Sequence, residues 1–259
     1  MNIVVCIKRV PFIQEVDLVI DGSGKDVEKE MLAFILNEWD NYAIEEAVLI
    51  KEKLGGTVTA ITIGFEEDEE VLRKCLAMGA DKAIRIDPGT NDLDGFVISN
   101  ILAKVIGKME YDLIMTGVQA DDDNHAMVGI MLAEQLGLPH AAVVNGLETA
   151  EGEATVKVEL EGGMDQISKI RLPALLSIQT GINEPRYVSI MGLRKARQKE
   201  LDVLNLDDLG LTADELSRQT FVEEAYLPPE TEGAEILSGE PAEVAEKILS
   251  IISERGVSI

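Results

Sequence analysis

Over the first 140 residues, short apolar runs alternate with longer amphipathic segments. Continuous apolar runs rich in β-branched residues indicate buried strands, and apolar residues at helical spacing indicate helices that cover a sheet. The expected strands are Asn2–Ile7, Thr57–Ile63, Lys82–Ile86, Asp112–Thr116 and Ala141–Val144, and the expected helices are Asp40–Leu54, Glu66–Met78, Leu93–Met109 and Ala126–Leu136. This alternation predicts an α/β fold, in which a parallel sheet carries helices on both faces.

The pattern changes after residue 150. Thr155–Glu161 and Gln166–Arg171 alternate between apolar and polar residues and flank Gly162-Gly163. This arrangement predicts an antiparallel β-hairpin. Ala174–Gln179 returns to the pattern of a buried strand.

No clear alternation is visible from Gly181 to about Gly239, where short apolar fragments stand between acids, glycines and prolines. So long an irregular stretch is rare inside a compact domain. We interpret it as an extended arm that lies on an obligate partner. An amphipathic helix is predicted after it, at Pro241–Glu254.

The charge balance limits the partners. The 259 residues include 48 acids and 23 basic residues, for a formal net charge of −25. Nucleic acids and anionic membranes bind basic patches, so neither is expected as a partner. No apolar run is long enough to cross a bilayer, and no leader pattern follows Met1, so we expect a cytoplasmic protein without membrane insertion.

Cysteine and histidine are scarce. Cys6 and Cys75 lie far apart within apolar patterns, so both are expected to be reduced core thiols. His125 and His140 are the only histidines, which leaves little for a metal site or a histidine-based catalytic triad.

The strongest candidate for chemistry is a loop that follows a buried strand and leads into a helix. It consists of Gly117, Val118, Gln119, Ala120, Asp121, Asp122, Asp123, Asn124, His125, Ala126, Met127, Val128 and Gly129. Ligands of parallel sheets usually bind at such carboxyl-end loops, and the N–H groups that begin the helix suit a phosphate. The alternative is that Asp123 or Asn124 only caps the helix.

Other chemistries of this loop are disfavoured. Consecutive aspartates point in different directions, and no second ligand cluster stands out, so a divalent metal is not expected. Neither a P-loop nor a Gly-x-Gly-x-x-Gly fingerprint is present, which disfavours ordinary NTPases and Rossmann dehydrogenases.

Asn37, Glu38, Trp39 and Asp40 precede the first long helix. In the structural interpretation, Asp40 caps this helix and Trp39 fills an apolar gap. In the functional interpretation, Trp39 presses against a planar ligand at the carboxyl edge of the sheet.

Several ordered segments together resemble one family, the small (beta) subunit of electron-transferring flavoproteins. The matching segments are Val5–Val10, Asn37–Ala47, Ala77–Asp81, Gly117–Gly129 and Asn183–Tyr187. Asn37–Asp40, Pro139–Val144 and Leu160–Met164 are most similar to the methylotroph-type branch, whose members contain AMP.

The resemblance implies an adenine-nucleotide-binding, Rossmann-like domain in a heterodimer. FAD would be held mainly by the large (alpha) subunit, with Trp39 and Ile13 near it. This chain would bury a structural AMP among Cys6, Asn37–Asp40, Ile63 and Gly117–Gly129. It would have no catalytic residues of its own. Electrons would come from an acyl-CoA or amine dehydrogenase and pass to a quinone-linked oxidoreductase.

The resemblance also implies a recognition loop at Tyr187–Lys195, which docks on the partner dehydrogenase. Ile190 takes the position of the aliphatic anchor, with Tyr187, Met191, Arg194 and Lys195 around it. The alternative is that Ile190 packs inside the arm. We therefore expect residues 1–180 to form the nucleotide-binding domain and residues 181–259 to form the recognition loop and an arm that embraces the large subunit.

Two other functions remain open from the sequence. Bifurcating members of the family hold a second FAD in the nucleotide site, and typically carry Asp-Gly-Asp-Thr where this chain has Asp122–His125. That difference favours AMP. A stand-alone, stress-type adenine-nucleotide-binding protein would also place a nucleotide at the sheet edge. This alternative does not explain the irregular stretch 181–239.

Overall fold

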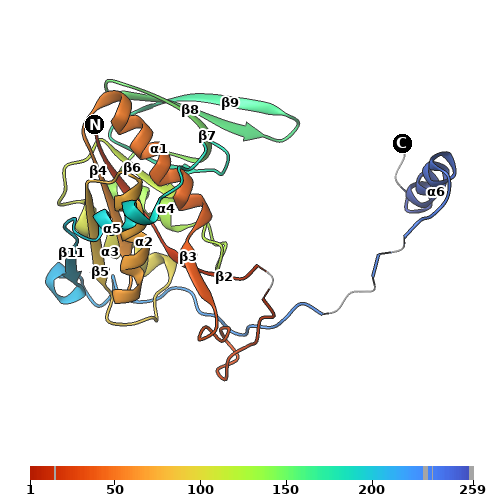
Figure 1. Cartoon of the computed structure of the whole chain (residues 1–259), viewed down its shortest axis with the longest axis horizontal. Helices are drawn as coiled ribbons and strands as arrows, with labels where there is room; N and C mark the ends of the chain where they lie inside the picture. Colours follow the sequence, from red (N-terminus) through yellow and green to blue (C-terminus); the bar gives the residue numbers. More distant parts are fainter. Residues whose placement is uncertain (15, 230–232, 235, 257–259) are drawn as a thin grey trace.

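A nine-stranded sheet forms the centre of the molecule in the computed structural model, which describes residues 1–14, 16–229, 233–234 and 236–256 (Figure 1). In spatial order its strands are β11 (Asp202–Asn205), β5 (Lys82–Asp87), β4 (Thr57–Ile63), β1 (Asn2–Cys6), β6 (Leu113–Gly117), β10 (Ala174–Ile178), β7 (His140–Ala150), β8 (Glu153–Leu160) and β9 (Met164–Arg171). All neighbours from β11 to β7 are parallel. The predicted α/β fold is therefore confirmed.

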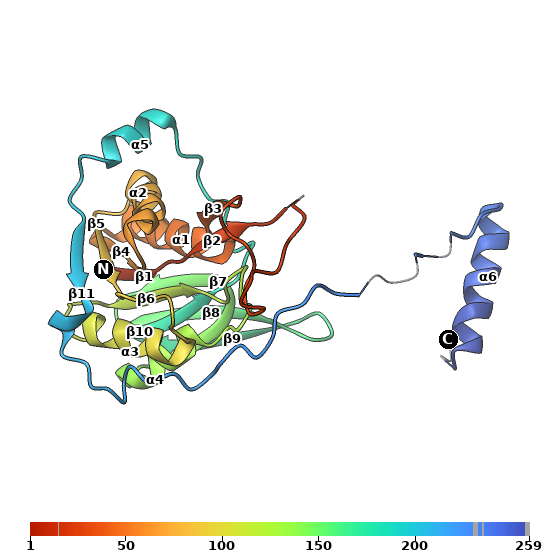
Figure 2. The ribbon, with the colours of Figure 1, turned by 90° about the horizontal axis from the view of Figure 1, so that it is seen from below.

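Helices cover both faces of the parallel part (Figure 2). The helices are α1 (Glu38–Leu54), α2 (Glu69–Met78), α3 (Gly95–Ile106), α4 (Val128–Leu136), α5 (Ile190–Ala196) and α6 (Pro241–Glu254). Apolar residues of α1 and α2 pack on one face, with Ala196 of α5, and those of α3 and α4 pack on the other. Alternate residues of β1 point to the two faces: Val5 joins the α1 and α2 side and Cys6 the α3 and α4 side.

The predicted β-hairpin is present as β8 and β9, which pair in antiparallel register from Glu153↔Arg171 to Leu160↔Met164. Gly162 and Gly163 both have positive φ, at 80° and 72°, a conformation that glycine adopts without steric cost. The hairpin extends from the rest of the sheet (Figure 1).

Three local expectations are wrong. No element was expected between Asn2–Ile7 and the first helix, yet this segment contains the antiparallel pair β2 (Arg9–Phe12) and β3 (Ala33–Leu36). The helix expected at 66–78 begins with the 3-10 turn η1 (Glu66–Asp68) before α2. The helix expected at Ala126 starts at Val128, because Ala126 has a φ of 53°, outside the helical region.

The expectation of an irregular chain from 181 to 239 is wrong for residues 190–209. This part contains α5, β11 and the 3-10 turn η2 (Leu206–Leu209), and β11 joins the parallel sheet beside β5. Ala196 and Leu209 are buried, so the segment packs on the sheet.

Beyond η2, the chain follows the body and then leaves it. The Asp94 carboxylate, at the start of α3, accepts hydrogen bonds from the N–H groups of Gln219 (2.6 Å) and Thr220 (2.8 Å). Figures 1 and 2 both show α6 apart from the body, and this helix has no buried residue. Its predicted bounds, Pro241–Glu254, are confirmed.

The two cysteines are free and buried, as expected. Burial raises the pKa of Cys6 to about 12 and that of Cys75 well above its usual range, so neither thiol is reactive near neutral pH. Among the helices of the described ranges, none has both the length and the apolar character needed to cross a bilayer.

Candidate functional site

Three adjacent strands bring the predicted site residues to one edge of the sheet. Cys6 ends β1, Ile63 ends β4 on one side, and Gly117 ends β6 on the other. Because parallel strands finish at the same edge, the loops that follow them lie beside one another. Cys6 is buried and Ile63 is partly buried.

Asn37 joins the two predicted loops. It is 1% exposed and occupies the N-cap position of α1, yet its side chain makes no capping hydrogen bond. Instead its Nδ2 donates to the carbonyl of Gln119 (2.8 Å), and its Oδ1 accepts from the N–H of Asp121 (3.1 Å). The Glu38 N–H also points at the Asp121 carboxylate. A single amide therefore sets the spacing between segments more than 80 residues apart in the chain.

Asp40 joins the ends of two strands. The expectation that it caps α1 is wrong, since it is the third residue of the helix and its carboxylate points at the sheet. One oxygen accepts from the N–H of Lys8 (2.7 Å) and the other from the N–H of Gly117 (2.9 Å). Burial raises the pKa of Asp40 to about 7, although both N–H donors and the Lys8 ammonium favour the ionised form.

Gly117 is required by this close approach. A Cβ at this position would lie 2.5 Å from Asp40 Oδ1 and 2.6 Å from Trp39 Cβ. Gly129, in the first turn of α4, faces Thr116 in the same way, at 2.6 Å from its Oγ1. Both glycines of the predicted loop thus serve packing between the loop, α1 and β6.

Trp39 is held by a specific contact. Its Nε1 donates to Gln179 Oε1 at 2.9 Å, just beyond the end of β10. The side chain is therefore fixed in direction at the sheet edge, rather than filling an apolar gap only.

Lys8 is a site residue that the sequence interpretation missed. Its Nζ donates to Asp122 (2.7 Å) and Asp123 (2.9 Å), and these carboxylates raise its pKa. The sequence signal that could have identified Lys8 is its position directly after a buried strand. Within the described residues, no group of histidine, cysteine, aspartate and glutamate has the arrangement of a metal site. The Lys8 ammonium occupies the position that a metal cation would need in order to bind both Asp122 and Asp123.

The start of α4 offers unoccupied N–H groups. Met127 is the N-cap residue and makes no side-chain capping bond, so the alternative that Asp123 or Asn124 caps the helix is wrong. Asp123 instead accepts from the N–H of His125, and Asn124 accepts from Gln119. First-turn N–H groups without a cap, together with the helix dipole, suit a phosphate.

The loop before α4 has an unusual backbone. Asn124 and Ala126 both adopt positive φ, at 51° and 53°. Left-handed residues interspersed in a loop can turn successive N–H groups toward one point, a geometry that binds anions. His125 and Ala126 are exposed, and Lys8 is the nearest cation that contacts the loop. The residues present therefore fit a nucleotide phosphate.

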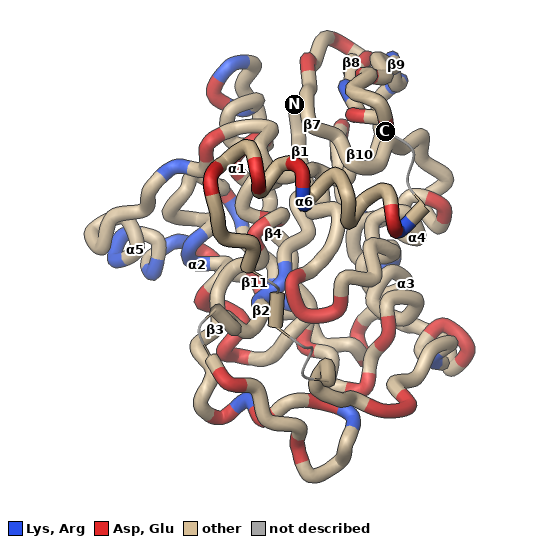
Figure 3. Tube along the Cα trace, turned by 90° about the vertical axis from the view of Figure 1, so that its right-hand side faces the viewer, with Lys and Arg blue, Asp and Glu red and all other residues tan. Residues whose placement is uncertain are grey.

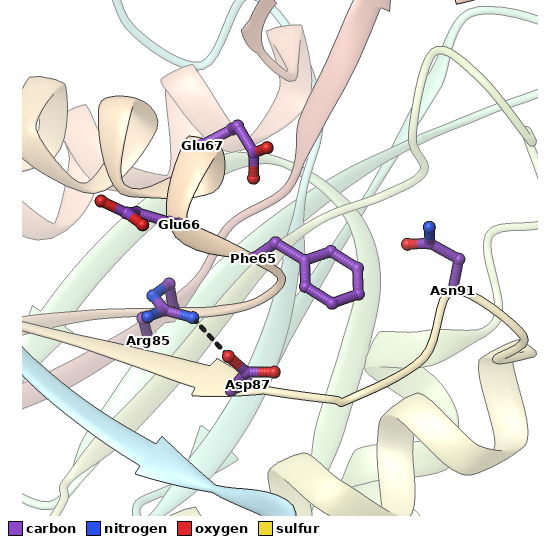
Figure 4. Close-up of a pocket in the computed structure, with 6 residues that line it drawn as sticks. All are labelled: Phe65, Glu66, Glu67, Arg85, Asp87 and Asn91. Carbon is purple, nitrogen blue, oxygen red and sulfur yellow. Dashed lines mark hydrogen bonds and ion pairs between the residues drawn. The ribbon is translucent and has the colours of Figure 1, made fainter.

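A pocket of about 500 Å³ lies at the ends of the neighbouring strands β4 and β5 (Figure 4). It is lined by Phe65, Glu66, Glu67, Arg85, Asp87 and Asn91. Arg85 is already paired with Asp87 and Glu69, each at 3.1 Å, so the lining is acidic on balance. The Phe65 ring can stack on a planar group, but the charge disfavours a phosphate here.

The predicted docking residues lie on a different part of the surface. Tyr187, Ile190 and Met191 are 90%, 70% and 68% exposed, so the alternative that Ile190 packs inside the arm is wrong. The segment is helical from Ile190 onward, and Ser189 caps α5 by accepting from the N–H of Gly192. Arg194 and Lys195 are exposed in its last turn, and Figure 3 shows lysines and arginines gathered around α5 and α2.

Comparison with known proteins identifies the family. The model of the electron transfer flavoprotein domain matches residues 27–209. The chain is 39% identical to the electron transfer flavoprotein subunit beta of Methylophilus methylotrophus, over 98% of each chain, and 40% identical to that of Bacillus subtilis, over 97% of each. It is 34% identical to the caffeyl-CoA reductase-Etf complex subunit CarD of Acetobacterium woodii, over 99% of this chain and 100% of that subunit. The chain therefore belongs to the electron transfer flavoprotein family, among its beta subunits.

Proposed function

We propose that this chain is the beta subunit of a cytoplasmic, heterodimeric electron carrier that binds a structural AMP. Its alpha subunit holds FAD, whose one-electron chemistry makes it suited to passing electrons between proteins. The donor is an acyl-CoA or amine dehydrogenase, the acceptor is a quinone-linked oxidoreductase, and this chain supplies no catalytic residue.

One observation carries the nucleotide assignment. Asn37 holds the loop 117–129 in place, and the helix α4 that follows this loop begins without a side-chain cap. Asn37 and Asp40 hold the loop, and the first N–H groups of α4 would donate hydrogen bonds to the phosphate. Lys8 would offset its charge. Since such a ligand binds only the folded arrangement, it would stabilise the native state.

The arm and the exposed apolar surfaces support the heterodimer. Ile248 and Leu249 of α6 are 44% and 51% exposed, and the helix contacts nothing in the described part of this chain that buries it. An amphipathic helix with an exposed apolar face is stable when it packs on a partner. We assign that role to the alpha subunit. Ile13, 42% exposed beyond β2, and Trp39 are the residues we place near its FAD.

Release of the bound small molecule tests the nucleotide assignment. The complex, purified, denatured and filtered, should yield AMP in a 1:1 ratio to this chain. Asn37→Ala should lower that content strongly, because losing the two part-buried hydrogen bonds that hold the 117–129 loop costs about 2–3 kcal/mol in the bound arrangement, or roughly 30- to 150-fold in affinity. Phe65→Ala, in the neighbouring pocket, is the matched control and should retain AMP. Release of two FAD per heterodimer, without AMP, would instead identify a bifurcating subunit. Full AMP in Asn37→Ala would refute the site.

Assembly is tested by removing α6. A chain that ends at Gly239 should fold with an unchanged melting temperature of its sheet domain, because no residue of α6 is buried against the body. Its yield of a yellow 1:1 complex, when co-expressed with the alpha subunit, should fall several-fold. Truncation without any loss of complex would exclude α6 from the interface.

A further inference from the structure

The docking segment 187–195 is fixed to the body at its N-terminal end by Arg186. The Arg186 guanidinium binds Glu45 of α1 through Nε (2.9 and 3.0 Å) and Nη2 (2.9 Å), and binds Glu52 through Nη1 (2.8 Å). Its backbone N–H donates to Glu45 as well, at 3.0 Å. Two carboxylates about two helical turns apart therefore hold one guanidinium in a single orientation.

A second contact strengthens this end. Asn183 Nδ2 donates to the carbonyl of Tyr42 (3.1 Å) and to Glu46 (2.9 Å), also on α1. Glu45 is only 3% exposed, so the pairing with Arg186 is shielded from water and from salt. The chain enters the docking segment from a rigid point.

The C-terminal end of the segment is fixed on a different helix. Arg73 of α2 donates through Nη1 to the carbonyls of Ala196 (3.1 Å) and Lys199 (2.6 Å). Lys199 Nζ in turn donates to the carbonyls of Leu76 (3.0 Å) and Ala80 (2.9 Å) at the end of α2. Ala196 itself is buried in the core.

Between these two ends, three large apolar side chains point to solvent. Tyr187, Ile190 and Met191 are at least 68% exposed, so their own packing does little to order them. The partly buried Val188, the Ser189 cap and the two ends determine where Ile190 lies. Holding a contact loop in its bound position before association reduces the entropy lost on binding.

We propose that Arg186 and Arg73 are positioning residues for docking, which fix the two ends of the 187–195 segment and so present Ile190 to the partner dehydrogenase. The inference rests on the proposed docking role of Ile190. Neither arginine needs to contact the dehydrogenase, because each acts by fixing the position of Ile190. Releasing either end should weaken docking and leave the flavin and the nucleotide unaffected.

The test uses the assembled heterodimer and follows electron transfer from the dehydrogenase as a function of carrier concentration. Removing Arg186 alone would leave the buried Glu45 without its partner, so Arg186→Met is combined with Glu45→Gln. Arg73→Met is combined with Lys199→Met, because both side chains hold the other end on α2 and neither change leaves a buried charge. Lys169→Met, which breaks the exposed pair with Glu153 on the hairpin, is the control.

Each release should raise the KM for the carrier roughly tenfold, with kcat, AMP content and chemical reduction of the flavin unchanged. In a background of Ile190→Ala, the same changes should have little further effect, since the side chain they position is gone. An unchanged KM in the variant that carries both Arg73→Met and Lys199→Met, or full additivity with Ile190→Ala, would overturn the inference. If Ile190→Ala alone has no effect, the docking proposal itself fails.

Discussion

Asp40→Asn is expected to lower the free energy of unfolding of the heterodimer by about 2–4 kcal/mol, because one buried N–H would lose its acceptor. The Asp40 carboxylate, 5% exposed, accepts from the N–H groups of Lys8 and Gly117 and so joins β1, β6 and α1. Asparagine keeps the shape but turns one acceptor into a donor. Denaturant unfolding of the two proteins measures the difference. AMP content should fall with it, since the start of α1 would lose its link to β1 and β6.

The effect should depend on pH. Burial raises the pKa of Asp40 to about 7, so its contribution to stability is complete below the pKa of the unfolded chain. That contribution is lost as the pH rises through about 7. Between pH 5 and pH 8 the parent should lose about 2–3 kcal/mol through this group, and Asp40→Asn should not.

The penalty of the substitution should therefore be larger at pH 5 than at pH 8. Asp112→Asn is a matched control, because Asp112 also accepts a backbone N–H, from Asn2 at 2.6 Å, but is exposed. It should show a small penalty. An equal penalty at both pH values for Asp40→Asn would contradict the assignment of the titration to this carboxyl.

The central fold could be predicted because its signal is local. Buried parallel strands such as Thr57–Ile63 are apolar throughout, and helices such as α1 repeat apolar residues at helical spacing. These patterns need no knowledge of neighbours. The paired strands Arg9–Phe12 and Ala33–Leu36 were missed because each has four residues, and the first contains Pro11, which disfavours a strand assignment.

The edge strand β11 was missed for a different reason. Asp202–Asn205 pairs with one neighbour only, and three of its four residues are exposed. An edge strand of this kind has almost no apolar pattern to detect. Its place beside β5 depends on pairing across more than 100 residues of sequence.

The sequence predicted which segments meet at the candidate site but not the contacts that join them. The rule that ligands bind at the carboxyl ends of parallel strands located both loops. The contacts that organise them join residues far apart in the chain: Lys8 with Asp122, 114 residues away, and Trp39 with Gln179, 140 residues away. Such pairs carry no periodic signal, so only the folded chain reveals them.

Ile190 occupies the anchor position of the family motif and also lies on the surface of the structure. It is the first residue of α5 and is 70% exposed, beside Tyr187 and Met191. Isolated large apolar side chains on a surface are common, but three of them between residues 187 and 191, on a segment fixed at both ends, are suited to contact a partner. Arg194 and Lys195 lie next to it and would act mainly on the rate of association.

Ile190→Ala removes three carbons from the proposed anchor and should cost about 1–3 kcal/mol of docking, or roughly five- to a hundredfold in affinity. Electron transfer from the dehydrogenase should fall at low carrier concentration and recover at saturation. The flavin spectrum, AMP content and chemical reduction should not change, because Ile190 contacts neither cofactor site. Val203→Ala, an exposed aliphatic change on β11, should leave transfer unaffected. A variant of Ile190 that transfers electrons at the parent rate below saturation, or that loses flavin, would exclude it as the docking anchor.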